Sequence, residues 1–233
     1  MIPYQEKFYC AVAKIDLNDL VTKLPKYLEV SRKNLIFANR MERTTKKIIQ
    51  ALAYIAYQQP GHKINSMKAY KLLWLADRYH LRQFGRTITG DTFFALPHGV
   101  VPSDAKNVVE HQATHIPTDE EYRDMYIKRL NKYSYQTIAE PDIMEFSDSD
   151  QDALDKILHC YGHLDQYKLE ELSHTFPEWL AYKAKLEAEG TPKAYKIDLD
   201  YFFDEAKEDK SGLFVDDPEK LSLVKDYFHE FSC

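Results

Sequence analysis

The sequence predicts a mainly α-helical (α+β) protein, with a compact helical domain, a small antiparallel β-hairpin or sheet, and an N-terminal extension. Apolar residues recur at steps of three and four over several segments, which is the period of a helix buried on one face. Short runs of β-branched and aromatic residues lie between these segments and favour strands. Hydrophobic residues make up 44% of the 233 residues, enough for a sizeable core. We expect an extension over residues 1–43, a core domain over 44–190 and a C-terminal segment over 191–233.

The first strong helical pattern begins near Thr44, and Pro60 with Gly61 ends it. A second helix is predicted from residue 68, with Ser66 as its cap and Gly85 at its left-handed end. This helix has one apolar face. Three basic residues fall outside that face and are expected to stay in water: Lys71, Arg78 and Arg82.

The pattern changes period after this helix. Residues 87–89 and 92–94 are β-branched or aromatic and flank Gly90 and Asp91, which predicts a tight hairpin turn at these two residues. Residues 97–102 contain two prolines and a glycine and are expected to form a loop, after which Ser103 caps the next helix. Alternation over residues 133–139 predicts a strand that pairs with the hairpin.

The rest of the chain is predicted to be helical with irregular connections. Ser147 caps a helix that Gly162 ends, and residues 191–216 are mixed and charged, which indicates irregular structure. The predicted helices cover about 104–112, 118–130, 148–161, 169–174, 177–188 and 218–231.

Charge and cysteine usage bound the class of protein. Residues 1–47 hold ten Lys or Arg against five Asp or Glu, whereas the remainder holds 21 against 32. An acidic body disfavours nucleic-acid binding but leaves room for an acidic partner near the basic N-terminal part. Three scattered cysteines fit a reducing cytoplasm, and no apolar run is long enough to predict secretion or a membrane span.

Two blocks of residues carry a family resemblance. The first holds Lys71-Leu72-Leu73, Ala76-Asp77, His80-Leu81, Gly85-Arg86, Ile88-Thr89-Gly90-Asp91, Ala95, Gly99 and Pro102-Ser103; the second holds Phe146-Ser147, Leu154, Tyr161, Leu169, Leu172-Ser173-His174 and Trp179. Together they cover roughly residues 45–182 and resemble the Panacea domain, also called the SocA-like or phage-associated GepA-like family. The family usually has Gly-Pro-x-Pro in the loop, whereas here Val100 follows Gly99.

The resemblance implies an antitoxin of a two-gene toxin–antitoxin module. Such a protein binds a cognate protein toxin, encoded by an adjacent gene, and covers its functional surface without turnover. No cofactor, metal or membrane is implied, and self-association stays open. We expect the toxin to contact the hairpin, its loop and the basic segment, with these candidate residues: Phe93, Phe94, His98, Val100, Arg40, Arg43 and Lys47.

A second set of family-motif residues is expected to support the fold. Its members are Asp77, His80, Gly85, Gly90, Asp91, Gly99, Pro102, Ser173, His174 and Trp179. The basic run before residue 48 is alternatively a solvated helix face. At least one of Phe93 and Phe94 is alternatively a core residue, because neighbours on a strand point to opposite faces.

Two other functions remain open from the residues alone. Asp77, His80, Asp91 and His98 could converge on a cleft that performs acid/base chemistry. The chain could also be an adaptor or mobile-element accessory protein that binds a host protein. Neither the spacing of His159 and His163 nor the adjacent Ser173 and His174 has the geometry of a zinc site or a catalytic pair.

Overall fold

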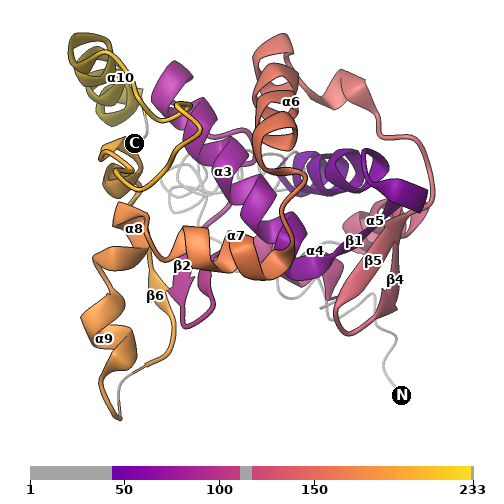
Figure 1. The fold of residues 1–233 in the computed structure, drawn as a ribbon. Coiled ribbons are helices and arrows are strands. Elements are labelled where there is room, and N and C mark those ends of the chain that lie inside the picture. Colours follow the sequence, from indigo (N-terminus) through magenta and orange to yellow (C-terminus); the bar gives the residue numbers. More distant parts are fainter. Residues whose placement is uncertain (1–43, 111–116, 191, 232–233) are drawn as a thin grey trace, which may run out of the picture. The chain divides into compact units, whose positions relative to one another are not determined.

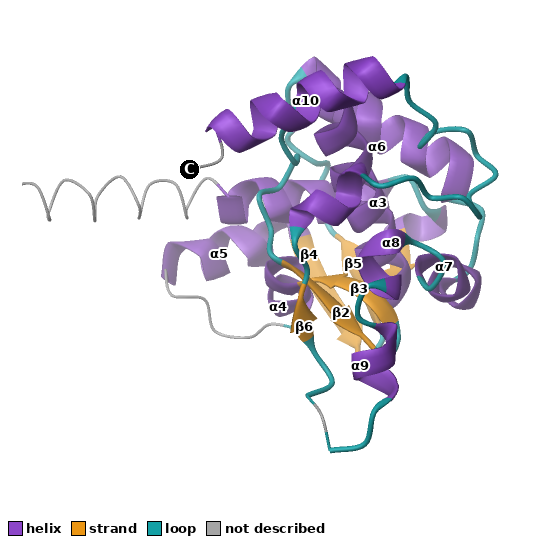
Figure 2. Cartoon of the chain, turned by 90° about the vertical axis from the view of Figure 1, so that its left-hand side faces the viewer, coloured by secondary structure: helices purple, strands orange, loops and turns teal. Residues whose placement is uncertain are grey.

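The computed structural model describes residues 44–110, 117–190 and 192–231, and residues 44–233 form one compact unit (Figure 1). Helices dominate this unit, and two small antiparallel sheets of three strands accompany them. Figure 2 shows α3, α6 and α10 gathered on one side of the strands. The predicted fold class is therefore confirmed.

Helix α3 (Ser66–Phe84) is the central element (Figure 1). It packs against α6 (Asp148–Tyr161), α7 (Gln166–Ser173) and α10 (Pro218–Phe231). The Asn65 side chain caps it by accepting from the backbone N–H groups of Met67 and Lys68, at 2.9 and 3.3 Å. Ser66, the predicted cap, is instead the first residue of the helix. The cap is Asn65, because its backbone is extended and its side-chain oxygen accepts from the first free amides of the helix. Gly85 ends the helix with a φ of +70°, as predicted.

The strands form two separate sheets. Strands β1 (Lys63–Asn65), β5 (Ser134–Thr137) and β4 (Ile127–Asn131) form the first, in the order β1-β5-β4. Strands β3 (Gly99–Pro102), β2 (Phe93–Leu96) and β6 (Tyr195–Lys196) form the second, in the order β3-β2-β6. The predicted pairing of residues 133–139 with the hairpin is wrong. Tyr135 is fully buried in the first sheet, and its hydroxyl donates to the carbonyl of Leu52 at 2.9 Å.

The hairpin lies further along the chain than predicted. Strands β2 and β3 pair in the register Phe93–Pro102 to Leu96–Gly99, so the turn is at residues 97–98. Gly90 and Asp91 are not a hairpin turn, because the amides of Ile88 and Thr89 donate to the Asp77 carboxylate, at 2.6 and 2.9 Å. A strand over residues 87–89 would need those amides for its partner, so these residues stay unpaired with any strand.

The remaining helices follow the predicted pattern with shifted bounds. The described part of the first helix covers residues 44–57. Ser147 and Asp150 form a reciprocal capping box at the start of α6, and Gly162 ends it, as predicted. Short 3₁₀ segments lie at Pro60–His62, Ile143–Glu145 and Leu199–Phe203, and the other helices are α4 (Ser103–Val109), α5 (Pro117–Tyr126), α8 (Pro177–Leu180) and α9 (Lys183–Glu187).

Three of these bounds correct the prediction. Helix α5 ends at Tyr126 rather than continuing to residue 130, because β4 starts at Ile127 and pairs with β5. The helix predicted over residues 177–188 is divided into α8 and α9 at Tyr182, whose ring stacks on Tyr195 with centroids 5.8 Å apart. Residues 191–216, predicted to be irregular, contain β6 and the 3₁₀ segment Leu199–Phe203.

The basic residues of α3 are buried, which the sequence analysis did not predict. Lys71 and Arg78 have no exposed surface, and Arg82 is 2% exposed. Arg78 Nε donates to Glu178 Oε1 at 3.0 Å, and Trp74 Nε1 donates to the same oxygen at 3.0 Å. An ionised group needs such partners when it leaves water, and here α8 supplies them.

Arg82 binds the segment after β6. Its Nη1 donates to the carbonyls of Phe202, Phe203 and Asp204 at 2.6–3.0 Å, and its Nη2 donates to that of Phe214 at 3.1 Å. Asp216 completes the site as an ion-pair partner at 2.7 Å. The guanidinium therefore ties both the 3₁₀ segment and the stretch around Phe214 to α3, and Phe202, Phe203 and Phe214 belong to the same core as the rest of the unit.

Candidate functional site

The outer face of the β2–β3 hairpin offers exposed apolar surface. Alternate residues of β2 point to opposite sides, so Phe93 and Ala95 are buried while Phe94 and Leu96 are only half-buried. Phe93 packs on Phe202 with ring centroids 5.2 Å apart. A partner cannot reach the Phe93 side chain, so the expectation that it contacts the toxin is wrong and Phe94 remains.

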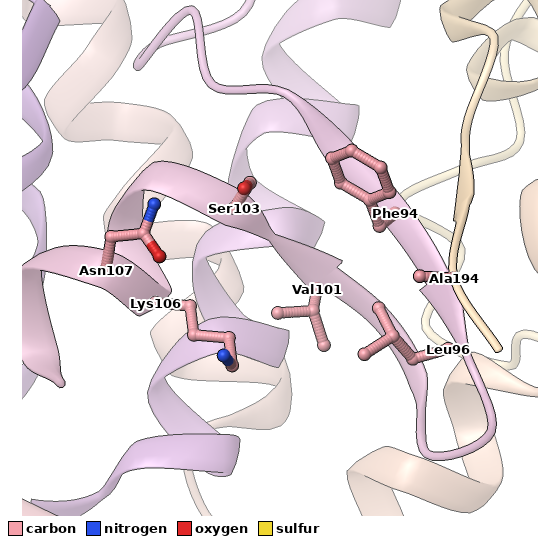
Figure 3. A pocket seen from close by; sticks show the side chains of 7 residues that line it. All are labelled: Phe94, Leu96, Val101, Ser103, Lys106, Asn107 and Ala194. Atoms are coloured by element: carbon pink, nitrogen blue, oxygen red, sulfur yellow. The ribbon is translucent and has the colours of Figure 1, made fainter. Parts of the chain in front are cut away.

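A shallow pocket of about 220 Å³ lies on this face. Figure 3 shows Phe94 and Leu96 on β2 and Val101 on β3, with Lys106 and Asn107 of α4 beside them. Ser103 and Ala194 complete the lining. Lys106 also forms an ion pair with Glu110 at 3.0 Å. The pocket thus combines an apolar floor with a polar rim on α4, an arrangement suited to a side chain of another protein.

Among the residues of this pocket, Phe94 alone was predicted from the sequence to contact a partner. Val101 was assigned to a loop and Leu96 was not singled out, although the alternation on either side of residues 97–98 is the signal that would have placed both on paired strands. Ala194 carries no such signal, because it joins the pocket through the pairing of β6 with β2.

His98 lies at the tip of the hairpin. Its side chain is 71% exposed, and its Nδ1 lies 2.7 Å from Glu170 Oε1 on α7. Val100, by contrast, is fully buried. The expectation that Val100 contacts a partner is therefore wrong, because its side chain faces α3 and the core. Of the four candidate contacts in and near the hairpin, Phe94 and His98 are accessible.

The inner side of the hairpin rests on a buried lysine. Lys71 Nζ donates to the carbonyls of His98 and Val100 at 2.7 and 2.8 Å. Burial lowers the pKa of Lys71 to about 7, although Glu170 acts in the opposite direction. Gly99 has a φ of +91°, and a Cβ there would collide with Ser173 Oγ and Lys71 Nζ. Only glycine fits this position.

Ser173, His174 and Trp179 brace the hairpin from α7 and α8. Ser173 Oγ donates to the carbonyl of Glu170 at 2.7 Å, so it does not face His174 as a nucleophile would. The His174 ring stacks on Trp179 with centroids 4.0 Å apart, and Trp179 Nε1 donates to the Leu96 carbonyl at 2.8 Å. Burial lowers the pKa of His174, which favours the neutral ring.

Asp77 and Asp91 organise the segment between α3 and β2. Asp77 accepts from two amides and from Thr89 Oγ1 at 2.6 Å. Asp91 accepts from the amides of Asp104 and Ala105, each at 2.8 Å, and so caps α4 in place of Ser103. Burial raises the pKa of Asp77 to about 6 and that of Asp91 to about 7, against the effect of these hydrogen bonds.

His80 contacts α6 rather than a cleft. Its Nδ1 lies 2.8 Å from the Arg86 carbonyl, and its Nε2 lies 3.0 Å from Ser149 Oγ and 3.2 Å from Asp150 Oδ1. Asp77, His80 and Asp91 are at most 5% exposed, whereas His98 is at the hairpin tip. The structure therefore does not bring these four residues together in an open cleft.

Of the three basic residues predicted near the first helix to contact a partner, the structure describes one, Lys47. Lys47 Nζ lies 2.6 Å from Asp150 Oδ2, and Arg86 Nη1 lies 3.0 Å from Asp150 Oδ1. Burial alone would raise the pKa of Asp150, but hydrogen bonds from Lys47 and Ser147 and the nearby cations lower it. Lys47 therefore neutralises a buried carboxylate. Arg40 and Arg43 lie outside the described residues.

The described part of the chain contains no cluster of three or more His, Cys, Asp or Glu that could hold a metal ion. None of its helices combines the length and apolarity needed to cross a lipid bilayer.

Comparison with known families identifies the domain. Residues 70–180, from α3 to the end of α8, match the family described as antitoxin SocA-like, Panacea domain. These residues include the buried lysine, the hairpin and the bracing residues of α7 and α8. The chain therefore contains a Panacea domain of the SocA-like antitoxin family. Searches against curated proteins and solved structures found no match.

Proposed function

We propose that this chain is an antitoxin that neutralises a cognate protein toxin by binding it directly and covering its functional surface. The match of residues 70–180 to an antitoxin-like family carries the proposal. The toxin would be encoded by an adjacent gene, and both proteins would act in the cytoplasm. Inhibition by occlusion needs one antitoxin per toxin and no turnover.

The outer face of the hairpin is the contact surface that we propose for this function. Phe94 is an aromatic side chain beside a pocket, and His98 is exposed at the tip. Aromatic anchors in pockets with polar rims carry much of the energy of protein interfaces. The buried brace formed by Lys71, Ser173 and Trp179 fixes the hairpin in place, which lowers the entropy lost on binding.

Co-expression with the product of the adjacent gene tests the function. We expect that product alone to arrest growth and this chain to restore it, with a one-to-one complex recovered by copurification. A neighbouring product that is harmless, or growth arrest that this chain does not relieve, would reject the antitoxin function. Capture of a host protein with no toxic neighbour would favour an adaptor instead.

A paired substitution tests the proposed surface. Phe94→Ala with His98→Ala should weaken the complex by about 10-fold or more, since two contacts are truncated at a binding face. Met144→Ala is the matched control, because Met144 is 86% exposed on a different segment. Equal affinities of the two variants for the toxin would remove the hairpin from the interface while leaving the antitoxin function intact.

A further inference from the structure

Helix α10 carries exposed apolar side chains beside those that pack on the core. Leu221, Val224 and Phe228 lie on its inner side and pack on the core, with Phe228 5.6 Å from Phe203 between ring centroids. Three further apolar side chains recur at four-residue steps about 90° around the helix from these, on a neighbouring side that we call the outer face of α10. They are Leu223, Tyr227 and Phe231, and they are 71%, 51% and 64% exposed.

The outer face is held in a fixed position. Tyr227 packs against Gly85 at the end of α3 so closely that a Cβ on Gly85 would lie 2.6 Å from Tyr227 Cδ1. The Tyr227 and Phe231 rings lie 4.6 Å apart between centroids. Figures 1 and 2 both show α10 beside α3 at the periphery of the helices. The aromatic pair is therefore anchored on one side and open on the other, as interface anchors are.

Charges are separated around the helix. At about 100° per residue, Glu219, Asp226 and Glu230 share the side next to Leu223. All three are exposed, and none forms an ion pair within the part of the chain that the structure describes. Lys225 and His229 lie on the other side, where each is 3.3 Å from a carboxylate oxygen of Asp200.

One basic residue shares the outer face but is already engaged. Lys220 Nζ donates to Gln83 Oε1 at 2.6 Å, which turns its charge toward α3. The outer face therefore presents an apolar stripe with an acidic flank. Its complement is an apolar groove with a basic rim.

We propose that the outer face of α10 docks in a basic-rimmed apolar groove of the protein toxin. The proposal rests on the antitoxin function and adds the chemistry of the partner. Contiguous exposed apolar surface of this kind is uncommon on proteins without a partner there. An amphipathic helix laid in a groove buries residues at i, i+4 and i+8 together, which is the spacing of Leu223, Tyr227 and Phe231.

Three full-length variants test the proposal against the purified product of the adjacent gene. The first replaces the stripe by Leu223→Ser with Phe231→Ser. The second reverses the acidic flank by Glu219→Lys, Asp226→Lys and Glu230→Lys. The control reverses two exposed acids elsewhere, Glu205→Lys and Glu208→Lys. Dissociation constants are measured at several salt concentrations, with thermal unfolding and sedimentation of each variant alone.

We expect the stripe variant to bind about 30-fold more weakly or worse, since it removes two interface anchors. The flank variant should also bind more weakly, and its affinity should lose the salt dependence of the wild type. The control should stay within about 2-fold of the wild type, because its charges lie off the interface. All variants should unfold near the wild-type temperature.

Each other outcome removes the proposal. Wild-type affinity of the stripe variant rejects α10 as the docking element, while the antitoxin function stands if the wild type still rescues growth. Tighter binding by the flank variant rejects the basic groove. A shift from dimer to monomer in the stripe variant, with unchanged toxin affinity, assigns the face to a second copy of this chain. Failure of the wild type to bind the product rejects the antitoxin function, and the docking proposal falls with it.

Discussion

Helices α3 and α10 are both amphipathic by sequence, yet the structure uses them in opposite ways. Fifteen of the 19 residues of α3 are buried, among them two arginines, a lysine, an aspartate and a histidine. No residue of α10 is buried, although it carries six large apolar side chains. Buried charged side chains, as in α3, and exposed apolar side chains, as in α10, are the reverse of the distribution that most proteins show. The comparison teaches that the polar residues of α3 hold the fold together, and that the three apolar residues on the outer face of α10 remain accessible.

The buried ion pair of α3 should give the largest effect. Arg78→Met leaves the Glu178 carboxylate buried with only Trp74 as a side-chain donor. We expect a loss of about 3–5 kcal/mol in the free energy of unfolding, because an uncompensated charge stays in the core. Urea denaturation measures it. A loss below about 1 kcal/mol would mean that the pair contributes little to holding α8 on α3.

The second-largest loss of stability is expected at Gly99, where the hairpin backbone lies close to Ser173 and Lys71. Gly99→Ala forces a side chain into left-handed backbone and into the space of Ser173 and Lys71. We expect about 2–4 kcal/mol of destabilisation from strain and overpacking together. Differential scanning calorimetry measures the shift in Tm. The control is Gly212→Ala, which also has positive φ but no atom within 4 Å, so it carries the backbone strain alone.

The lysine of α3 should make stability depend on pH. Its folded pKa is about 7, below the value of about 10.5 expected for an unfolded chain. Between these values the unfolded chain binds more protons, so the stability of the wild type rises with pH from about 7 upward, at up to about 1.4 kcal/mol per pH unit. Lys71→Met should flatten this rise between pH 7 and pH 9. Parallel wild-type and variant curves would contradict the assignment.

The outer face of α10 should give the smallest effect on folding. Leu223→Ser should change the free energy of unfolding by no more than about 0.5 kcal/mol, because the side chain is mostly in water already. Leu221→Ser, on the inner side of the same helix, is the matched comparison and should cost more. Urea denaturation of both variants shows whether the two sides of α10 differ in this way.

Sequence reasoning recovered the helices and the fold class because local periodicity encodes both. It assigned Lys71, Arg78 and Arg82 to water because their partners lie 27 to 134 residues away, and no local pattern reveals a carbonyl at Phe214 or a carboxylate at Asp216. The hairpin was misplaced for a similar reason. Residues 87–89 have the composition of a strand, but Asp77 takes the amides that a strand would use.

The candidate surface was predicted only in part. Phe94 and His98 were expected at an interface and are accessible, whereas Phe93 and Val100 are buried by the alternation of β2 and by the contact of β3 with α3. The last helix was predicted at about residues 218–231, but the sequence does not show which of its apolar residues face the core. That division depends on where Gly85 and Phe203 lie.

The position of Arg82 also sets the order in which the protein can be completed during synthesis. One of its carbonyl partners, that of Phe214, lies 132 residues further along the chain. At elongation rates of about 5–20 residues per second, the ribosome takes roughly 7–26 s to add those residues. For most of that time none of its acceptors among residues 202–216 has been synthesised, because the first of them, the carbonyl of Phe202, lies 120 residues further along the chain. A nascent chain that stops before residue 202 leaves this charge without those partners, so we expect such a truncated chain to be a target for proteases.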